Sequence, residues 1–214
     1  MTNRCFPFTL LLVILLVEGG SSLMEPFDPD SMADESADES AESATQVTST
    51  RPEPEPLHNG VGGSDVNLRI YRLREMRRKC WHDIYHTAIE VYGVEVAYGK
   101  NGMIRDQVGE MDKVYDFQKV ETLCSTQLSF NEIKEIGDQV EQYFLEEYGG
   151  YNLLAANCND FSEAFAKKLC PGVAFPRHLN SLARRVRRVT SFSKRLQRRI
   201  GDYIYETCLA GDSA

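Results

Sequence analysis

The sequence predicts an α+β domain in which antiparallel strands come first in the chain and helices follow. The first observation is the alternation of apolar and polar residues over 66–71, which has the two-residue period of a half-buried strand. The second is a pair of β-prone runs, 84–92 and 94–98, which are hinged at Gly93 as in a hairpin. The third is the helical spacing of apolar residues that takes over at Ser129. Strands followed by helices are the order of the α+β class.

The remaining elements are predicted from turn and cap residues. Glycines mark a turn over 99–102, and residues 114–117 are expected to form a further short strand. The segment Ser129-Phe-Asn-Glu132 has the form of a capping box, in which two side chains satisfy backbone N–H groups at a helix start. This helix is expected to end at Gly149-Gly150, and a second helix is expected over 157–169.

The first 22 residues are predicted to be a secretory signal peptide. Arg4 gives a short positive start, residues 6–17 form an apolar run, and Gly20-Ser-Ser22 supplies the small residues that signal peptidase prefers. The apolar run is too short to span a bilayer comfortably, since a span takes about 20 residues. A signal anchor and a buried N-terminal helix are the alternatives. A signal peptide implies the secretory pathway or secretion, and a cytoplasmic protein is the alternative location.

Opposite charges flank the region that is predicted to fold. Residues 25–55 hold ten acidic residues and one basic residue, a net charge of −9, and they lack the apolar residues needed for a core. Residues 182–214 hold eight basic and three acidic residues, a net charge of +5. We therefore expect an acidic disordered linker over 23–65, one folded domain over 66–182 and a basic amphipathic extension over 183–214.

The apolar residues of this extension are spaced for one helical face. They are Leu182, Val186, Val189, Phe192, Leu196, Ile200 and Ile204. A helix docked on the domain fits this pattern, and so does a helix that binds an anionic membrane surface. A third alternative is a clasp on the acidic segment 25–55. We expect no nucleic acid partner, and the sequence leaves homo-oligomerisation open.

Cys158 is a candidate nucleophile because of its place at the predicted start of a helix. Asn157 is a plausible N-cap, which puts Cys158 in the first helical turn. There the helix dipole favours the thiolate, and backbone N–H groups could stabilise an oxyanion. The alternative is a small buried apolar residue, which is the usual role of a free cysteine.

His86 is the candidate base, because it lies in a predicted strand that would restrain its side chain. His82 is four residues earlier and is the competitor for that role. Cys80, His82 and His86 together also offer three ligands for zinc, but their spacing fits no usual structural zinc pattern and no fourth ligand accompanies them. We expect neither a metal nor a cofactor.

Two blocks of the sequence resemble the PPPDE-domain family of permuted papain-fold thiol peptidases, which includes deSUMOylating isopeptidases. The first block is Ile84-Tyr-His-Thr-Ala-Ile-Glu-Val91 with the following 95–104, and the second runs from Tyr151 through Asn157-Cys-Asn159 to Leu182. The resemblance covers about residues 66–182. It implies a permuted papain-like fold, with His86 and Cys158 as the catalytic dyad.

This resemblance implies a cysteine-dependent hydrolase that cleaves an amide or isopeptide bond, as a deubiquitinase or deSUMOylase does. The substrate would be a protein, and ubiquitin-like conjugates are the candidates. A protein S-acyl thioesterase could use the same dyad, and a catalytically silent binding module is the alternative from another class. The signal-like leader and the basic extension depart from the cytosolic members of the family, which leaves the substrate open.

Overall fold

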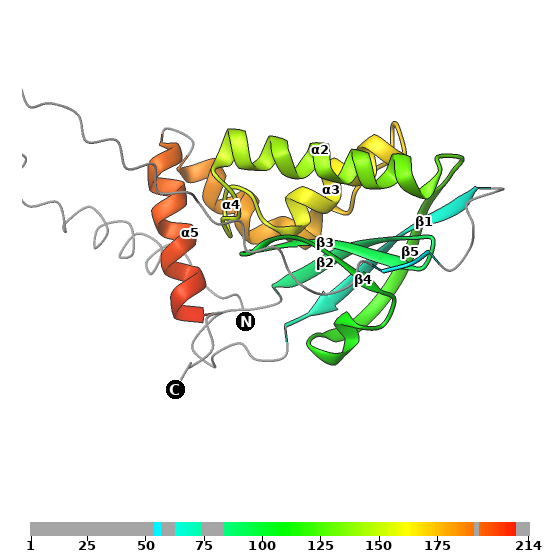
Figure 1. The fold of residues 1–214 in the computed structure, drawn as a ribbon. Helices are drawn as coiled ribbons and strands as arrows, with labels where there is room; N and C mark the ends of the chain where they lie inside the picture. The colour runs from blue at the N-terminus through cyan, green and yellow to red at the C-terminus, as the bar shows by residue number, and fades with distance from the viewer. Residues whose placement is uncertain (1–53, 57–62, 74–83, 191–192, 209–214) are drawn as a thin grey trace, which may run out of the picture. The chain divides into compact units, whose positions relative to one another are not determined.

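The computed structural model describes residues 54–56, 63–73, 84–190 and 193–208, which belong to one compact unit that spans residues 53–214 (Figure 1). The predicted signal peptide over 1–22 and nearly all of the predicted linker lie outside the described residues. None of the described helices is long and apolar enough to cross a membrane.

Five antiparallel strands form one sheet in the order β4-β3-β2-β1-β5. Their bounds are β1 Ser64–Arg72, β2 Tyr85–Val91, β3 Val94–Gly99, β4 Gly102–Gln107 and β5 Asp116–Thr126, with a short 3₁₀ helix η1 at Met111–Lys113. The predicted first strand and hairpin are therefore confirmed. The strand expected over 114–117 begins later and is longer than predicted, because β5 pairs with the whole length of β1.

The hairpin between β2 and β3 turns at two residues with positive φ. Tyr92 has φ 53° and Gly93 has φ 77°, which is the left-handed pair that a two-residue hairpin turn with the right twist requires. The Tyr92 ring is buried and its hydroxyl donates to the Leu128 carbonyl at 2.9 Å. This contact helps a non-glycine residue to hold a conformation that it seldom adopts.

Two helices, α2 Phe130–Tyr148 and α3 Cys158–Leu169, cover one face of the sheet (Figure 1). The predicted capping box is present at the start of α2, where Ser129 and Glu132 bond reciprocally, and Gly149 ends the helix in the left-handed conformation. The main core lies between these helices and the sheet. A smaller buried cluster on the other face contains Tyr71, Ala88, Ala97 and Met111. The α+β class is thus confirmed, with strands first and helices afterwards.

The C-terminal region forms two helices instead of one continuous amphipathic helix. They are α4 Ser181–Val189, which follows the 3₁₀ helix η2 Arg177–Asn180, and α5 Lys194–Cys208. Thr190 ends α4, where its hydroxyl donates back to the Val186 carbonyl at 2.7 Å, and the Ser193 hydroxyl accepts the N–H of Leu196 at the start of α5. The prediction of a single apolar helical face is wrong because of this break between α4 and α5. Val189, which belongs to that predicted face, is exposed.

Both C-terminal helices nevertheless pack on the domain. Val186 and Ile200 are fully buried, and Lys194 of α5 pairs with Glu147 of α2 at 2.6 Å. Arg187 of α4 pairs with Asp160 of α3 at 2.8 Å. The structure therefore agrees with a docked extension, and the membrane-bound and clasped alternatives stay predictions.

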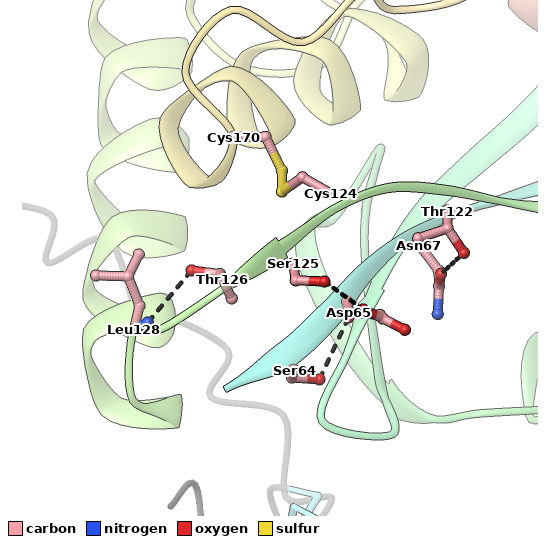
Figure 2. The surroundings of a disulfide bond; sticks show 9 residues. All are labelled: Ser64, Asp65, Asn67, Thr122, Cys124, Ser125, Thr126, Leu128 and Cys170. Atoms are coloured by element: carbon pink, nitrogen blue, oxygen red, sulfur yellow. Dashed lines mark hydrogen bonds between the residues drawn. A yellow bond between two sulfur atoms is a disulfide. The ribbon is translucent and has the colours of Figure 1, made fainter. Parts of the chain in front are cut away.

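A disulfide joins the sheet to the end of the helix that carries Cys158 (Figure 2). Cys124 lies in β5 and Cys170 is the C-cap of α3, with Cα atoms 6.1 Å apart and 46 residues of separation. The spacing of the cysteines gave no pairing. Cys158 is free and buried.

Candidate active site

Cys158 is the first residue of α3, and Asn157 fixes that position. The Asn157 side chain accepts the N–H groups of Asn159 at 2.9 Å and Asp160 at 3.0 Å. The Asp160 carboxylate accepts the N–H of Asn157 at 3.2 Å, which completes a capping box. Asn157 also donates to the Leu153 carbonyl at 2.8 Å, so the loop before the helix is held as well. The predicted N-cap is confirmed.

α3 is attached to the start of β2 by contacts on both sides of His86. Cys158 Sγ lies 3.9 Å from the carbonyl oxygen of Tyr85, and Asn159 Nδ2 donates to the same oxygen at 3.1 Å. The Thr87 hydroxyl donates to Asn159 Oδ1 at 3.2 Å. The sulfur therefore lies beside the β2 backbone at the residues that flank His86.

The His86 side chain leaves β2 on the sheet face opposite α3. His86 pairs across the sheet with Tyr71 of β1, and their ring centroids are 6.3 Å apart. The ring of Tyr115, which follows η1, stacks on the imidazole with centroids 4.6 Å apart and an interplanar angle of 26°. Within the described part of the chain, the imidazole is bounded by these rings and makes no hydrogen bond.

A cavity of about 630 Å³ is lined by both His86 and Cys158. It lies at the end of the sheet where β1 and β3 end and β2 begins, and α4 and α5 contribute to its wall. Five tyrosines line it, namely Tyr85, Tyr98, Tyr115, Tyr151 and Tyr205. Leu153, Leu179 and Leu182 add apolar surface, and Lys100 and Lys113 add positive charge. The two residues predicted to form the dyad thus line one concave surface to which five tyrosines contribute.

Burial decides the protonation of the dyad in this closed site. It raises the pKa of Cys158 to about 12, although the backbone N–H groups of Thr87, Asn159 and Cys158 itself act in the opposite direction. Burial also lowers the pKa of His86 to about 4. The expected thiolate at the helix N-terminus is therefore wrong for the resting site, because desolvation outweighs the helix dipole. At neutral pH the pair is a thiol and a neutral imidazole.

A sequence model of the family described as "PPPDE putative peptidase domain" matches residues 66–199, which is more than half of the chain. The chain belongs to the PPPDE family. A curated relative from Caenorhabditis elegans, named "Desumoylating isopeptidase 1 homolog", is 28% identical over 122 residues. That alignment covers 53% of this chain and 36% of the relative, so the chain spans about a third of the relative's length. Membership supports a peptidase or isopeptidase, in agreement with the resemblance that the two sequence blocks carry.

The PPPDE site also contains residues that sequence reasoning did not assign. Tyr115 and Tyr205 line the cavity, and neither belongs to a sequence motif from which the site was predicted. Asn180 accepts from Asn157 Nδ2 at 2.9 Å and donates to Asp160 at 2.7 Å, so it supports the start of α3 from η2. Their roles depend on packing between distant segments, so no local signal in the sequence marked them.

Some of the sequence candidates lie outside the described residues. Cys80 and His82 are among them, so the zinc alternative and the competing base stay predictions. His178 lies in η2, where its ring meets Tyr85 edge-on with centroids 6.4 Å apart. His178 is not among the residues that line the cavity shared by His86 and Cys158.

Proposed function

We propose that the chain is a cysteine-dependent isopeptidase or peptidase with Cys158 as nucleophile and His86 as general base. The observation that carries the proposal is that His86 and Cys158 line the same cavity, with Cys158 Sγ 3.9 Å from the carbonyl oxygen of Tyr85, the residue before His86. Catalytic hydrogen bonds are often long before the substrate binds and shorten in the complex, so the absence of a direct bond in the resting site is compatible with this role.

The proposed reaction begins from the neutral pair. His86 accepts the proton of the Cys158 thiol while the sulfur attacks the carbonyl carbon, because a thiol of raised pKa supplies little free thiolate. The oxyanion forms near the backbone N–H of Cys158 at the start of α3, since the N–H groups of Asn159 and Asp160 already donate to the Asn157 side chain. The C–N bond then breaks as the imidazolium protonates the leaving amine. Water, activated by His86, hydrolyses the acyl-enzyme and restores the thiol.

We propose ubiquitin-like conjugates as the substrate class to test first. The support is family membership and the name of the relative, which describes a desumoylating isopeptidase. A protein S-acyl thioesterase is the second candidate, and the apolar and aromatic lining of the cavity favours it, since such a lining suits an acyl chain. The third is a silent binding module, against which the intact dyad argues.

One assay separates these candidates. The full-length chain is incubated with isopeptide-linked ubiquitin-like conjugates and, in parallel, with S-acylated peptides. Cys158→Ala and His86→Ala are each expected to lower turnover by about 100-fold or more, as loss of a nucleophile or general base does. His178→Ala is the matched control and should retain activity. If His82→Ala abolishes turnover while His86→Ala does not, the assignment of the base is wrong.

We also propose that the protein enters the secretory pathway. The support is the signal-like leader together with the Cys124–Cys170 bridge, since stable disulfides form mainly in oxidising compartments. Mass spectrometry of alkylated protein from its native source tests both points. Cleavage near residue 22 with the bridge intact supports the proposal, whereas an intact N-terminus with all thiols alkylated rejects it.

A further inference from the structure

Among the residues that the structure describes, the imidazole of His86 is held by aromatic rings and not by a polar partner. Catalytic histidines are commonly oriented by a third group that bonds the other ring nitrogen. Here the neighbours are Tyr115, stacked at 4.6 Å, and Tyr71, at 6.3 Å between centroids. The two tyrosines are also in mutual contact, with centroids 6.0 Å apart. Whatever fixes these two rings therefore fixes the imidazole.

Tyr71 is fixed by a buried ion cluster on its own sheet face. Its hydroxyl donates to Glu95 and accepts from Arg69 Nε at 2.8 Å. Glu95 is fully buried, and its carboxylate lies 3.3 Å from Arg69 Nε. Arg69 is also paired with Glu90 at 3.1 Å. Tyr71 is itself fully buried, so its ring has one position relative to the strand that carries His86.

The same cluster holds the segment that supplies Tyr115. Glu95 accepts the backbone N–H of Gly109 at 2.8 Å, and Arg69 Nη2 pairs with Asp112 at 3.3 Å. One turn later, the N–H of Tyr115 donates to the Met111 carbonyl at 2.9 Å. Arg69 and Glu95 thus anchor both rings that contact His86, the first directly and the second through residues 109–115.

A buried ion cluster of this kind is a poor way to gain stability alone. Desolvation of the charges offsets much of their attraction, and apolar residues of similar volume are often equally stabilising. What the cluster adds is a fixed orientation of the side chains that it joins, because each hydrogen bond or ion pair has a preferred geometry.

Arg105 and Asp138 offer a comparison. They form an ion pair between β4 and α2 in which Asp138 is largely exposed, and the pair lies apart from the Arg69–Glu95 cluster.

We infer that the Arg69–Glu95 cluster, acting through the rings of Tyr71 and Tyr115, positions His86 for proton transfer with Cys158. These are positioning residues, and within the described part of the chain they take the place of a polar third member of the site. The inference rests on the proposed function. Tyr71 and Glu95 do not line the cavity, so they act on the reaction through His86 and Tyr115 and not by contact with a substrate there. Among the described residues, the titratable side chains beside the His86 ring are Tyr71 from β1 and Tyr115 from the segment after η1, and Cys158 of α3 lines the same cavity.

Tyr71→Phe tests the inference away from the substrate, because it removes the hydroxyl anchor and keeps the ring. We expect kcat to fall about 10-fold or more with KM changed less than about 2-fold, since small displacements of a catalytic group have effects of this size. Tyr115→Leu should lower kcat in the same way, and Tyr115→Phe, which keeps the stack, should restore it. Asp138→Asn is the matched control and should leave kcat unchanged.

A second readout does not depend on turnover. NMR titration of the His86 ring should show its pKa raised toward 6.5 in Tyr115→Leu, because loss of the stack admits water, and unchanged in Tyr115→Phe. Normal kcat together with an unchanged ring pKa in both Tyr71→Phe and Tyr115→Leu would overturn the inference. If the wild-type chain hydrolyses no substrate, the proposed function fails, and the titration still decides whether the rings hold His86. Thermal melts confirm that each variant is folded.

Discussion

Removal of the Cys124–Cys170 bridge should destabilise the domain strongly without changing its chemistry. The bridge closes a loop of 46 residues, for which the chain-entropy relation gives about 13 cal mol⁻¹ K⁻¹, or about 4 kcal/mol at 25 °C. The expected loss in the double variant Cys124→Ala/Cys170→Ala is therefore close to 4 kcal/mol. Cys158 lies at the other end of the 12-residue α3, about 18 Å away, so its reactivity at low temperature should be retained.

Urea unfolding measures the loss directly. With a slope of about 2 kcal/mol per molar urea, the midpoint should fall by about 2 M. Cys158→Ala is the matched control, because it removes the sulfur of a buried cysteine that has no bridge. A double variant that loses no more than this control would refute the reasoning, since the bridge would then contribute no constraint. Alkylation of Cys158 in the folded double variant checks that the start of α3 is intact.

Three further predictions concern the site and its supports. Because the pKa of His86 is lowered to about 4, the unfolded chain binds a proton between pH 6.5 and about 4 while the folded chain does not. The free energy of unfolding should therefore fall as pH decreases through this window, by on the order of 3 kcal/mol. In His86→Ala, the urea midpoint should no longer change with pH across the same window. Asn157→Ala removes the cap of α3 and should lower the free energy of unfolding, measured in urea, by about 1–2 kcal/mol. Labelling or turnover at Cys158 should also become slower. Unchanged stability and reactivity would contradict the capping role. Gly201→Ala places a Cβ against the Asn152 side chain and should loosen α5, seen as faster proteolysis within 194–208. Gly137→Ala meets the flexible Met103 and Arg105 side chains and should not.

Local patterns in the sequence were sufficient to predict most of the elements. The alternation over 66–71, the hairpin at Gly93 and the capping box at Ser129 are confirmed, since each depends on residues close together in the chain. The dyad residues His86 and Cys158 do line one cavity, although their catalytic role stays a prediction.

What could not be predicted depends on contacts between distant residues. The length of β5 is set by its pairing with β1, and the stack of Tyr115 on His86 joins residues that are 29 positions apart in the chain. The sign of the Cys158 pKa shift is also of this kind. The helix start can be recognised in the sequence, but the burial that outweighs it comes from the packing of α3 against β2.

The docking of α5 has a practical consequence for the design of shortened versions of the protein. Asn152, in the loop before Cys158, donates to the Arg198 carbonyl and to Asp202, and Tyr205 both lines the cavity and meets Tyr151 edge-on. A chain cut at residue 182, or at residue 199 where the family match ends, would lose this wall and expose apolar surface beside Cys158. Expression of the folded unit should therefore extend at least to residue 208, with any affinity tag placed beyond it on a spacer.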